Sequence, residues 1–483
     1  MTQGELFAFT YLFGFALLFS VGSVLGLAAL LQLERSIGRW VAASVVPGMA
    51  LAIAAGTLLS NRDLKYAYAN IGALGLNPLP GGAMLLRTIT AIIVGLAVAS
   101  IIARLFGKPR GQTAIAAAPG LPGLPGQMLL VTFLLFYISN ELLNSALGTY
   151  PSFSHNTLYV PLVFVAVYMS RNEPAQAFAR SAKLALLGLM VLSLLAAVAL
   201  PALALEPNYK GWVPGLTVRL WGVGSNANSI GPLALLLMLL ELYCPSTTRL
   251  GRCLVWGLAL AVLLLAQSKT ALLAGLLITP IVAWYRIGRH PTGGVRIGFV
   301  LGLLAVLIAV LLGLMFGNLD KLWARLAVGQ VGDQISSLSG RVQIWNAAIN
   351  AWRDNPLFGY GPLAWGPLHR ATIGMPYAFS AHNQFLQSLS VAGGLGLATL
   401  LIFLAALGIY AWRAAEMTRG ATLAMFAFVL IRCMTEAPLS AGNIFTGEIL
   451  TMLVLFRLVI VGSKPDAAPQ SAMPFARTKA IAA

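Results

Sequence analysis

Long apolar runs dominate the sequence and constrain its fold more than any other feature. Most are about 15–27 residues long, and a helix needs about 20 apolar residues to cross the hydrocarbon core of a bilayer. The runs therefore predict an all-α, polytopic membrane helical bundle of about 12–13 spans. The first run, at 7–33, exceeds the apolar core of a cleavable signal, about 7–15 residues, so we expect it to be a span.

Composition excludes a soluble enzyme. Hydrophobic residues make up 59% of the 483 residues and charged residues 9%, whereas a soluble domain has about 25% charged residues. The net charge of +17 would suggest nucleic acid binding in a soluble protein. In a membrane protein much of it is expected, because lysine and arginine collect in cytoplasmic loops, so no nucleic acid partner is predicted. The three cysteines lack the spacing of a metal site or a disulfide framework.

Basic turns give the predicted orientation. If the runs alternate across the bilayer, these turns fall on one side, which the positive-inside rule makes cytoplasmic. The loops 206–228 and 317–384 and the turn "QSKT" (267–270) then fall together on the outer side. With about 13 spans the N-terminus lies outside, and with about 12 both termini lie inside. The basic turns are 104–112, 171–183, 244–252, 286–296 and 412–420.

One long polar interruption sets the predicted domain organisation. Within it, the segment 339–356 predicts a helix that Ser339 caps and that stops before Pro356, so this loop is expected to be partly helical. The predicted segments are membrane helices with short loops over 1–316, a large outer loop over 317–384, further membrane helices over 385–462, and a disordered cytoplasmic tail over 463–483.

Several basic residues oppose the orientation rule, because they fall on the outer side. Lys269 occupies a tight turn between two apolar runs, where a cation is costly unless it is paired or solvated. We predict that Arg219, Lys269 and Arg341 cluster and bind a polyanion, since arginine offers a bidentate fork to phosphate and lysine a point charge. The alternative for Lys269 is a side chain that extends to the membrane interface.

The stretch "SAHNQFLQSL" (380–389) marks the place where the polar loop meets a long apolar run. Ser380 is predicted to cap a helix whose first turn contains His382 and Asn383. The free N–H groups of such a turn favour a nearby anion and keep a histidine neutral, so His382 can act as a base. The alternative is a structural or solvated histidine. His369, nearby in sequence, is expected to be solvated.

Two segments, "SGRVQIWNAAINAWRDNPLFGYG" (339–361) and "HNQFLQSLSVAGGLGL" (382–397), resemble the O-antigen ligase and polymerase superfamily of integral membrane glycosyltransferases. The family pattern runs roughly S-G-R…W…P…G-x-G, then H-N…L…G…G. The segment "RLWGVGSNANSIG" (219–231) resembles the family's arginine-plus-asparagine segment, and "LLLAQSKTALLAG" (263–275) resembles a turn that usually reads S-R. The matching positions are Ser339, Gly340, Arg341, Trp345, Pro356, Gly359, Gly361, His382, Asn383, Leu386, Gly393 and Gly396, with Lys269 in the arginine place of the turn.

The resemblance implies an enzyme that moves a glycan from an undecaprenyl-pyrophosphate carrier to an acceptor hydroxyl on the periplasmic face of the bacterial inner membrane. The acceptor is lipid A–core for an O-antigen ligase. It is a growing O-antigen chain for a polymerase, and a protein hydroxyl for an O-oligosaccharyltransferase. Polymerases often carry an arginine, ten residues and then a glycine in both main periplasmic loops. Neither Arg219 nor Arg341 is followed by a glycine at this spacing. The nearest case is Gly231, which comes one place late after Arg219. The resemblance therefore favours the ligase, with the other two as alternatives.

The residue types fit this reaction. Fixed cations stabilise a pyrophosphate leaving group, and the acceptor hydroxyl needs a base. His382 is the predicted base, and Arg219, Lys269, Arg341 and Asn383 are the predicted ligands of the pyrophosphate or glycan. A single base without a protein nucleophile implies inversion at the anomeric carbon. With 14 acidic residues in the chain and no D-x-D pair on the outer face, we expect no cofactor and metal-independent transfer.

A function of another class stays open at this point. A transporter of lipid-linked glycans would share the basic polyanion site, but it would not need a basic histidine. Replacing His382 therefore separates transport from transfer. Near the end of a predicted span, Arg432 and Glu436 have the i,i+4 spacing of a helical ion pair, and we expect them to pair structurally.

Overall fold

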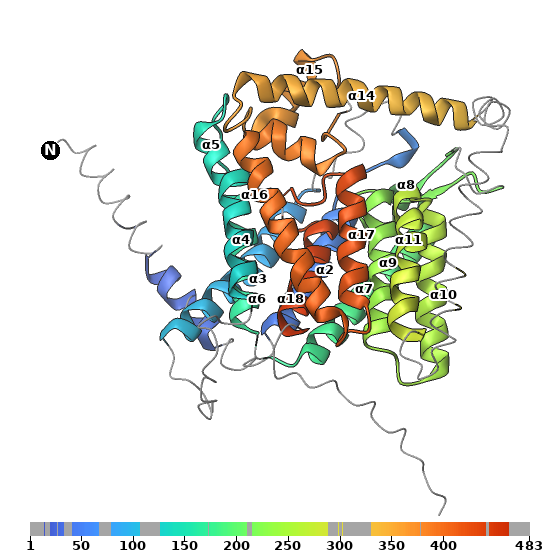
Figure 1. Cartoon of the computed structure of the whole chain (residues 1–483). Coiled ribbons are helices and arrows are strands. Elements are labelled where there is room, and N and C mark those ends of the chain that lie inside the picture. The colour runs from blue at the N-terminus through green and yellow to red at the C-terminus, as the bar shows by residue number, and fades with distance from the viewer. Residues whose placement is uncertain are drawn as a thin grey trace, which may run out of the picture.

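The structure, a computed structural model, describes residues 14, 20–26, 28–32, 41–66, 79–106, 126–171, 173–209, 215–287, 298, 302, 330–376, 378–440 and 444–462. These residues are mostly helical, which confirms the predicted all-α class (Figure 1). Six helices among them are long and apolar enough to cross a membrane, and shorter apolar helices accompany them. The predicted tail 463–483 and nearly all of the predicted span at 297–316 lie outside the described residues.

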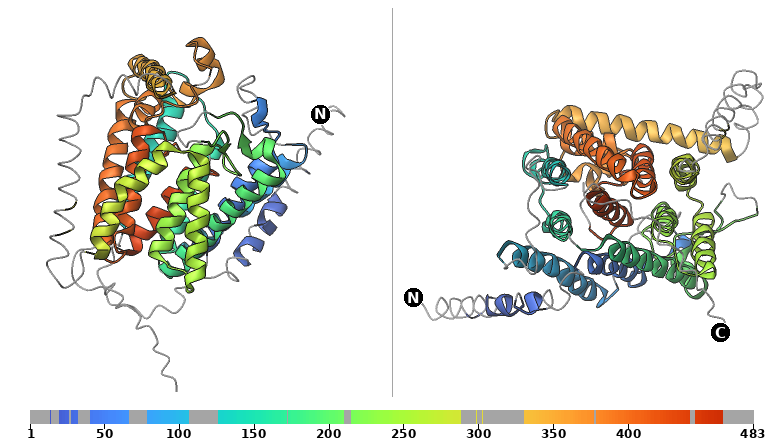
Figure 2. Two further views of the ribbon diagram at one scale, coloured as in Figure 1. Left: turned by 90° about the vertical axis from the view of Figure 1, so that its right-hand side faces the viewer. Right: turned by 60° about the horizontal axis from the view of Figure 1, so that its bottom comes forward.

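The apolar helices stand side by side in one bundle (Figures 1 and 2). One of them changes geometry along its length, because α4 (Gln127–Tyr137) continues through the π-helical turn η4 (Ile138–Leu143) into α5 (Asn144–Leu147). The other bundle helices are α2 (Val41–Leu58), α3 (Gly82–Phe106), α6 (Tyr159–Met169), α7 (Ala175–Ala199), α9 (Ala227–Tyr243), α10 (Arg249–Ala266), α11 (Lys269–Ile287), α16 (Gln384–Ala415), α17 (Ala421–Thr435) and α18 (Gly447–Gly462).

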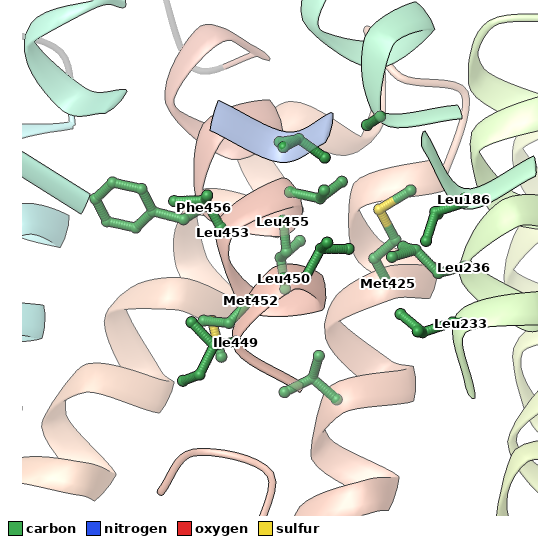
Figure 3. Packing of buried hydrophobic residues seen from close by; sticks show 14 of the residues in the cluster. Leu186, Leu233, Leu236, Met425, Ile449, Leu450, Met452, Leu453, Leu455 and Phe456 are labelled. Carbon is green, nitrogen blue, oxygen red and sulfur yellow. The ribbon is translucent and has the colours of Figure 1, made fainter. Parts of the chain in front are cut away.

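Helix α18 forms the centre of the bundle. Apolar residues lie on all of its faces, with Arg457 as a buried exception that donates to the Glu173 carbonyl at 2.7 Å, and a helix of this kind is buried on every side. From Ile449 to Ile460 every residue is buried, and the other helices surround it in Figure 2. Figure 3 shows side chains of α7, α9 and α17 facing one side of it, for example Leu186, Leu236 and Met425 on the same side of Leu450.

Helix α14 (Gln330–Asp354) lies across one end of the bundle, above α16 (Figure 1). The predicted stop before Pro356 is correct, but the predicted cap at Ser339 is wrong, because the helix begins at Gln330 and Ser339 lies inside it. The remaining short elements are η6 (Pro362–Trp365), α15 (Pro367–Thr372), η2 (Leu64–Tyr66), η5 (His155–Leu158), α8 (Pro201–Ala204), and the strands β1 (Leu205–Glu206) and β2 (Arg219–Leu220).

The two strands and the turn between α10 and α11 meet at the same end. Strands β1 and β2 pair antiparallel, with Glu206 opposite Arg219. The turn is as tight as predicted, since α10 ends at Ala266 and α11 begins at Lys269. Arg219 Nε donates to the Ala266 carbonyl at 3.0 Å, and Gln267 Nε2 donates to the Val218 carbonyl at 2.9 Å. Two of the outer segments grouped from the sequence are therefore in direct contact.

A buried arginine holds the loop that leads into α9. The Arg62 guanidinium donates to the carbonyls of Gly222 at 2.7 Å, Gly224 at 2.7 Å and Leu203 at 2.8 Å. Backbone carbonyls left without partners in a buried loop would be costly. Arg62 satisfies them together, and so fixes the segment from which Asn228 enters the site.

The glycine-containing segment 356–361 packs against the first part of α16. Helix α16 is broken at Gly393, whose φ of 66° and ψ of −162° are outside the helical range. Tyr360 N donates to the Ser390 carbonyl at 2.9 Å and Gly361 N to the Val391 carbonyl at 3.0 Å. A Cβ on Gly359 or Gly393 would lie within 2.7 Å of the opposing backbone. Glycine at these two positions therefore allows the segment to pack directly against the backbone of α16.

Candidate active site

His382 lies in the connection that enters α16, not inside the helix. The predicted cap is wrong, because the N-cap is Asn383, whose Oδ1 accepts from Phe385 N at 2.9 Å and Leu386 N at 3.1 Å. Ser380 Oγ instead accepts from His382 N at 3.3 Å. His382 has a φ of +47°, a left-handed conformation that costs free energy but that histidine tolerates better than most residues.

Neighbouring contacts hold this conformation. Ala381 N donates to Gln387 Oε1 at 2.8 Å, and Ala381 O accepts from Trp345 Nε1 of α14 at 3.1 Å. Strained backbone persists only where its surroundings over-determine it. The tryptophan on α14 and the glutamine on α16 meet that condition, and they place the imidazole at the junction of the two helices.

The imidazole of His382 pairs with Glu436, the residue directly after α17. His382 Nδ1 lies 2.8 Å from Glu436 Oε2. The imidazole is 31% exposed and the carboxylate 13%, so a substrate can reach the histidine while the glutamate stays behind it. Among the described residues none hydrogen-bonds to Nε2 of His382. Sequence reasoning missed this partner.

Glu436 is held on its other side by Asn228 of α9. Asn228 Nδ2 donates to Glu436 Oε1 at 3.1 Å, and Arg341 Nη2 lies 4.0 Å from the same oxygen. Burial raises the pKa of the Glu436 carboxyl, but the hydrogen bond from His382 and the charges of His382, Arg432 and Arg341 outweigh it, so the pKa is lowered. Glu436 is therefore ionised at neutral pH.

Arg219, Lys269 and Arg341 come together around this pair, as the sequence predicts. Arg219 Nη2 donates to Asn228 Oδ1 at 2.9 Å, and its guanidinium stacks over Tyr209, 4.7 Å from the ring centroid. Arg341 Nη1 reaches the Thr435 carbonyl at 3.4 Å. Lys269 is exposed and lies within electrostatic reach of both arginines. The three cations come from β2, α11 and α14.

Asn383, the fourth predicted ligand, uses both ends of its side-chain amide to bind backbone groups of the protein. Its oxygen caps α16, as above, and its Nδ2 donates to the Met434 carbonyl at 3.4 Å. In the structure it is therefore a helix cap that ties α16 to α17. A role for Asn383 in holding substrate stays a prediction.

The predicted ion pair between Arg432 and Glu436 is wrong. Arg432 Nη2 donates to Glu448 Oε1 at 3.2 Å and to the Asn228 carbonyl at 2.9 Å. The local i,i+4 spacing favoured Glu436, but α18 brings a second carboxylate to Arg432 and leaves Glu436 to His382. One signal in the sequence pointed to Glu436: it is one of only 14 acidic residues and it follows a predicted span directly.

His369 lies apart from this cluster, beside the C-terminal half of α14. Its ring stacks on Tyr360 with centroids 4.1 Å apart, and it is half-buried, so it is partly solvated and also packed on a neighbouring ring. Burial lowers the pKa of His369, and the charge of Asp354 opposes this. The ring lines a groove of about 430 Å³ together with Asn346 and Asn350.

The fold and the site define a multi-pass membrane protein with a histidine–carboxylate pair and a cluster of cations at one end of its bundle. Residues 254–401 match the model of a family described as O-antigen ligase. The chain thus carries an O-antigen ligase domain, which confirms the family resemblance, and it is a membrane enzyme of the glycosyltransferase type. The match includes Lys269, Arg341 and His382. No curated protein matches the chain significantly.

Proposed function

We propose that the chain is an O-antigen ligase. In this proposal it transfers a glycan from undecaprenyl pyrophosphate to a sugar hydroxyl of lipid A–core at the periplasmic face of the bacterial inner membrane. The observation that carries the proposal is the 2.8 Å pair of His382 and Glu436 beside the converging cations. Transfer needs both parts, because the acceptor must lose a proton while the pyrophosphate gains charge. The proposal includes transfer without a metal ion or cofactor.

The proposed reaction is a single displacement. Nε2 of His382 takes the proton of the acceptor hydroxyl while the hydroxyl oxygen attacks the anomeric carbon of the glycan. The bond from that carbon to the pyrophosphate oxygen breaks, and its electron pair leaves with undecaprenyl pyrophosphate. Because attack and departure occur on opposite faces of the sugar, the configuration at the anomeric carbon is inverted.

The cations contribute unequally in this proposal. Arg341 is 32% exposed and makes one long hydrogen bond to a described residue, so its fork can turn to a phosphate. Arg219 is 16% exposed, and two of its nitrogens already donate to Ala266 and Asn228. We therefore assign pyrophosphate binding chiefly to Arg341 and Lys269. Arg219 contributes its charge and holds the site together.

The test is a transfer assay with purified protein. The protein is given lipid-linked O-antigen with either lipid A–core or additional donor as the acceptor. A product on lipid A–core supports the ligase, whereas elongation of the donor without such a product identifies a polymerase. The missing arginine–glycine spacing supports the first outcome.

A matched variant separates transfer from transport. His382→Asn removes the base but keeps a residue that tolerates the left-handed backbone at this position. We expect transfer to fall by about 10²–10⁴-fold, the usual contribution of a general base, while folding is kept. A variant that transfers glycan at the wild-type rate would exclude His382 as the base. If the variant loses transfer but still moves lipid-linked glycan across the membrane at the wild-type rate, His382 serves transfer and not transport.

A further inference from the structure

We infer that Glu436 is a positioning residue that fixes which nitrogen of His382 carries the proton, and that Asn228 links Glu436 to Arg219. The inference rests on the proposed transfer reaction and deepens it. Sequence spacing assigned Glu436 to a structural ion pair with Arg432. The contacts in the structure give it a different partner and a different role.

The donor and acceptor capacities of the groups determine the protonation pattern. An ionised carboxylate can only accept hydrogen bonds. Glu436 Oε2 lies 2.8 Å from Nδ1 of His382, so Nδ1 must carry a hydrogen. In the neutral imidazole the lone pair then lies on Nε2, the nitrogen that can face an acceptor hydroxyl. The glutamate thereby sets the tautomer that a base requires and stabilises the imidazolium that forms when the base takes a proton.

Asn228 holds the carboxylate in a fixed orientation. A guanidinium can only donate hydrogen bonds, so the asparagine oxygen must face Arg219, at 2.9 Å. The asparagine nitrogen must then face Glu436 Oε1, at 3.1 Å. Neither end of the amide can turn round without a loss of both contacts. Arg219, Asn228, Glu436 and His382 thus form one hydrogen-bonded chain with a single direction.

The distances argue against a structural ion pair with an arginine as the main role of Glu436. Arg432 donates to Glu448 at 3.2 Å, and the nearest cation atom that forms an ion pair with Glu436 in the described structure belongs to Arg341, at 4.0 Å. The contact with His382 is shorter than either. The carboxylate is therefore oriented by the asparagine and directed at the imidazole.

Charges from several elements act on this pair. The charged groups nearest to the pair are Arg341 from α14 and Arg432 from α17. Arg219 from β2 and Lys269 from α11 lie one contact further away. All of these are cations. Removal of the only carboxylate in the pair therefore leaves the imidazole among cations, with no acceptor at Nδ1 to fix its tautomer.

The test compares Glu436→Gln with Glu448→Gln. Glutamine keeps the shape of glutamate but can also donate, so it fixes neither tautomer. For Glu436→Gln we expect the maximal rate to fall at least about 10-fold, with little change in the KM for acceptor. Asn228→Ala should change the rate in the same direction by less. Glu448→Gln, which removes a carboxylate that pairs with Arg432, should keep the wild-type maximal rate.

A second measurement does not depend on the reaction. NMR of the protein with ¹⁵N-labelled histidine reports which ring nitrogen carries the hydrogen, and His382→Asn identifies the signal among the four histidines of the chain. We expect hydrogen on Nδ1 in the wild type and a mixture in Glu436→Gln. Hydrogen on Nε2 in the wild type, or an unchanged maximal rate in Glu436→Gln, would overturn the inference. If ligation fails but the tautomer is as expected, only the proposed function is wrong.

Discussion

Substitution of Gly393 by alanine should separate the framework of the site from its chemistry. At a φ of 66° and a ψ of −162° an alanine is strongly disfavoured, since this region is essentially reserved for glycine and costs of order 1–3 kcal/mol. The added Cβ would also lie 2.4 Å from the Leu357 carbonyl carbon and oxygen and 2.7 Å from Gly359 N. Ordinary contacts are about 3.5–4.0 Å, and backbone atoms cannot rotate away. Strain and clash together should destabilise the fold by more than about 3 kcal/mol.

The expected result is a lower unfolding temperature in detergent and loss of glycan transfer, because the segment 356–361 no longer packs on the start of α16. The matched control is Gly257→Ala in α10, where a Cβ meets no atom within 4 Å. This control should be neutral or slightly stabilising, since alanine favours a helix over glycine by about 1 kcal/mol. Wild-type stability and activity in Gly393→Ala would refute the packing argument, whatever the control does.

The remaining predictions concern the charges of the site. Arg341→Ala should lower the rate of transfer at limiting donor concentration by about 10- to 100-fold, since a hydrogen bond to a charged group contributes about 1.5–3 kcal/mol. The control is Arg353→Ala, on the same helix and exposed, which should leave the dependence of the rate on donor concentration unchanged. Lys269→Arg should retain substantial activity and Lys269→Ala should lose most of it, because the charge matters more than the donor geometry; an active alanine variant would remove Lys269 from the site. Transfer should persist in excess EDTA with detergent-dispersed acceptor, and a strict requirement for a divalent ion that added metal restores would contradict metal-independent transfer. The lowered pKa of Glu436 means that its stabilisation is present above its ordinary pKa of 4.5 and is lost as the pH falls through the folded-state pKa. The difference in unfolding free energy between wild type and Glu436→Gln should therefore shrink on acidification, and a difference that grows would show that the sign is wrong.

The sequence alone determined the class of fold and most of the residues that come together. Hydropathy is a local property, so long apolar runs predict membrane helices without knowledge of their neighbours. Charge placement is also local. Arg219, Lys269 and Arg341 could be selected because each contradicts the positive-inside rule, and the alternation of spans placed them on one side with His382.

Details within single segments were harder to predict where two residues offered the same chemistry. Ser380 and Asn383 are both good helix caps. The choice between them depended on the left-handed turn at His382, which Gln387 of α16 and Trp345 of α14 hold through their hydrogen bonds to Ala381. The role of Gly393 was hidden for a similar reason. A glycine permits an unusual backbone, but only the packed segment 356–361 shows why one is needed there.

The partners of the histidine were decided by tertiary structure alone. Glu436 is 54 residues from His382 in sequence, and Asn228 is 208 residues from Glu436. Local spacing instead favoured the pair Arg432 and Glu436, because residues four apart meet on one helix. That preference is worth only about 0.2–0.5 kcal/mol, and packing of α18 against α17 overrides it by bringing Glu448 to Arg432. Which carboxylate pairs with His382 therefore depends on how α9, α16, α17 and α18 pack, and no local pattern in the chain encodes that arrangement.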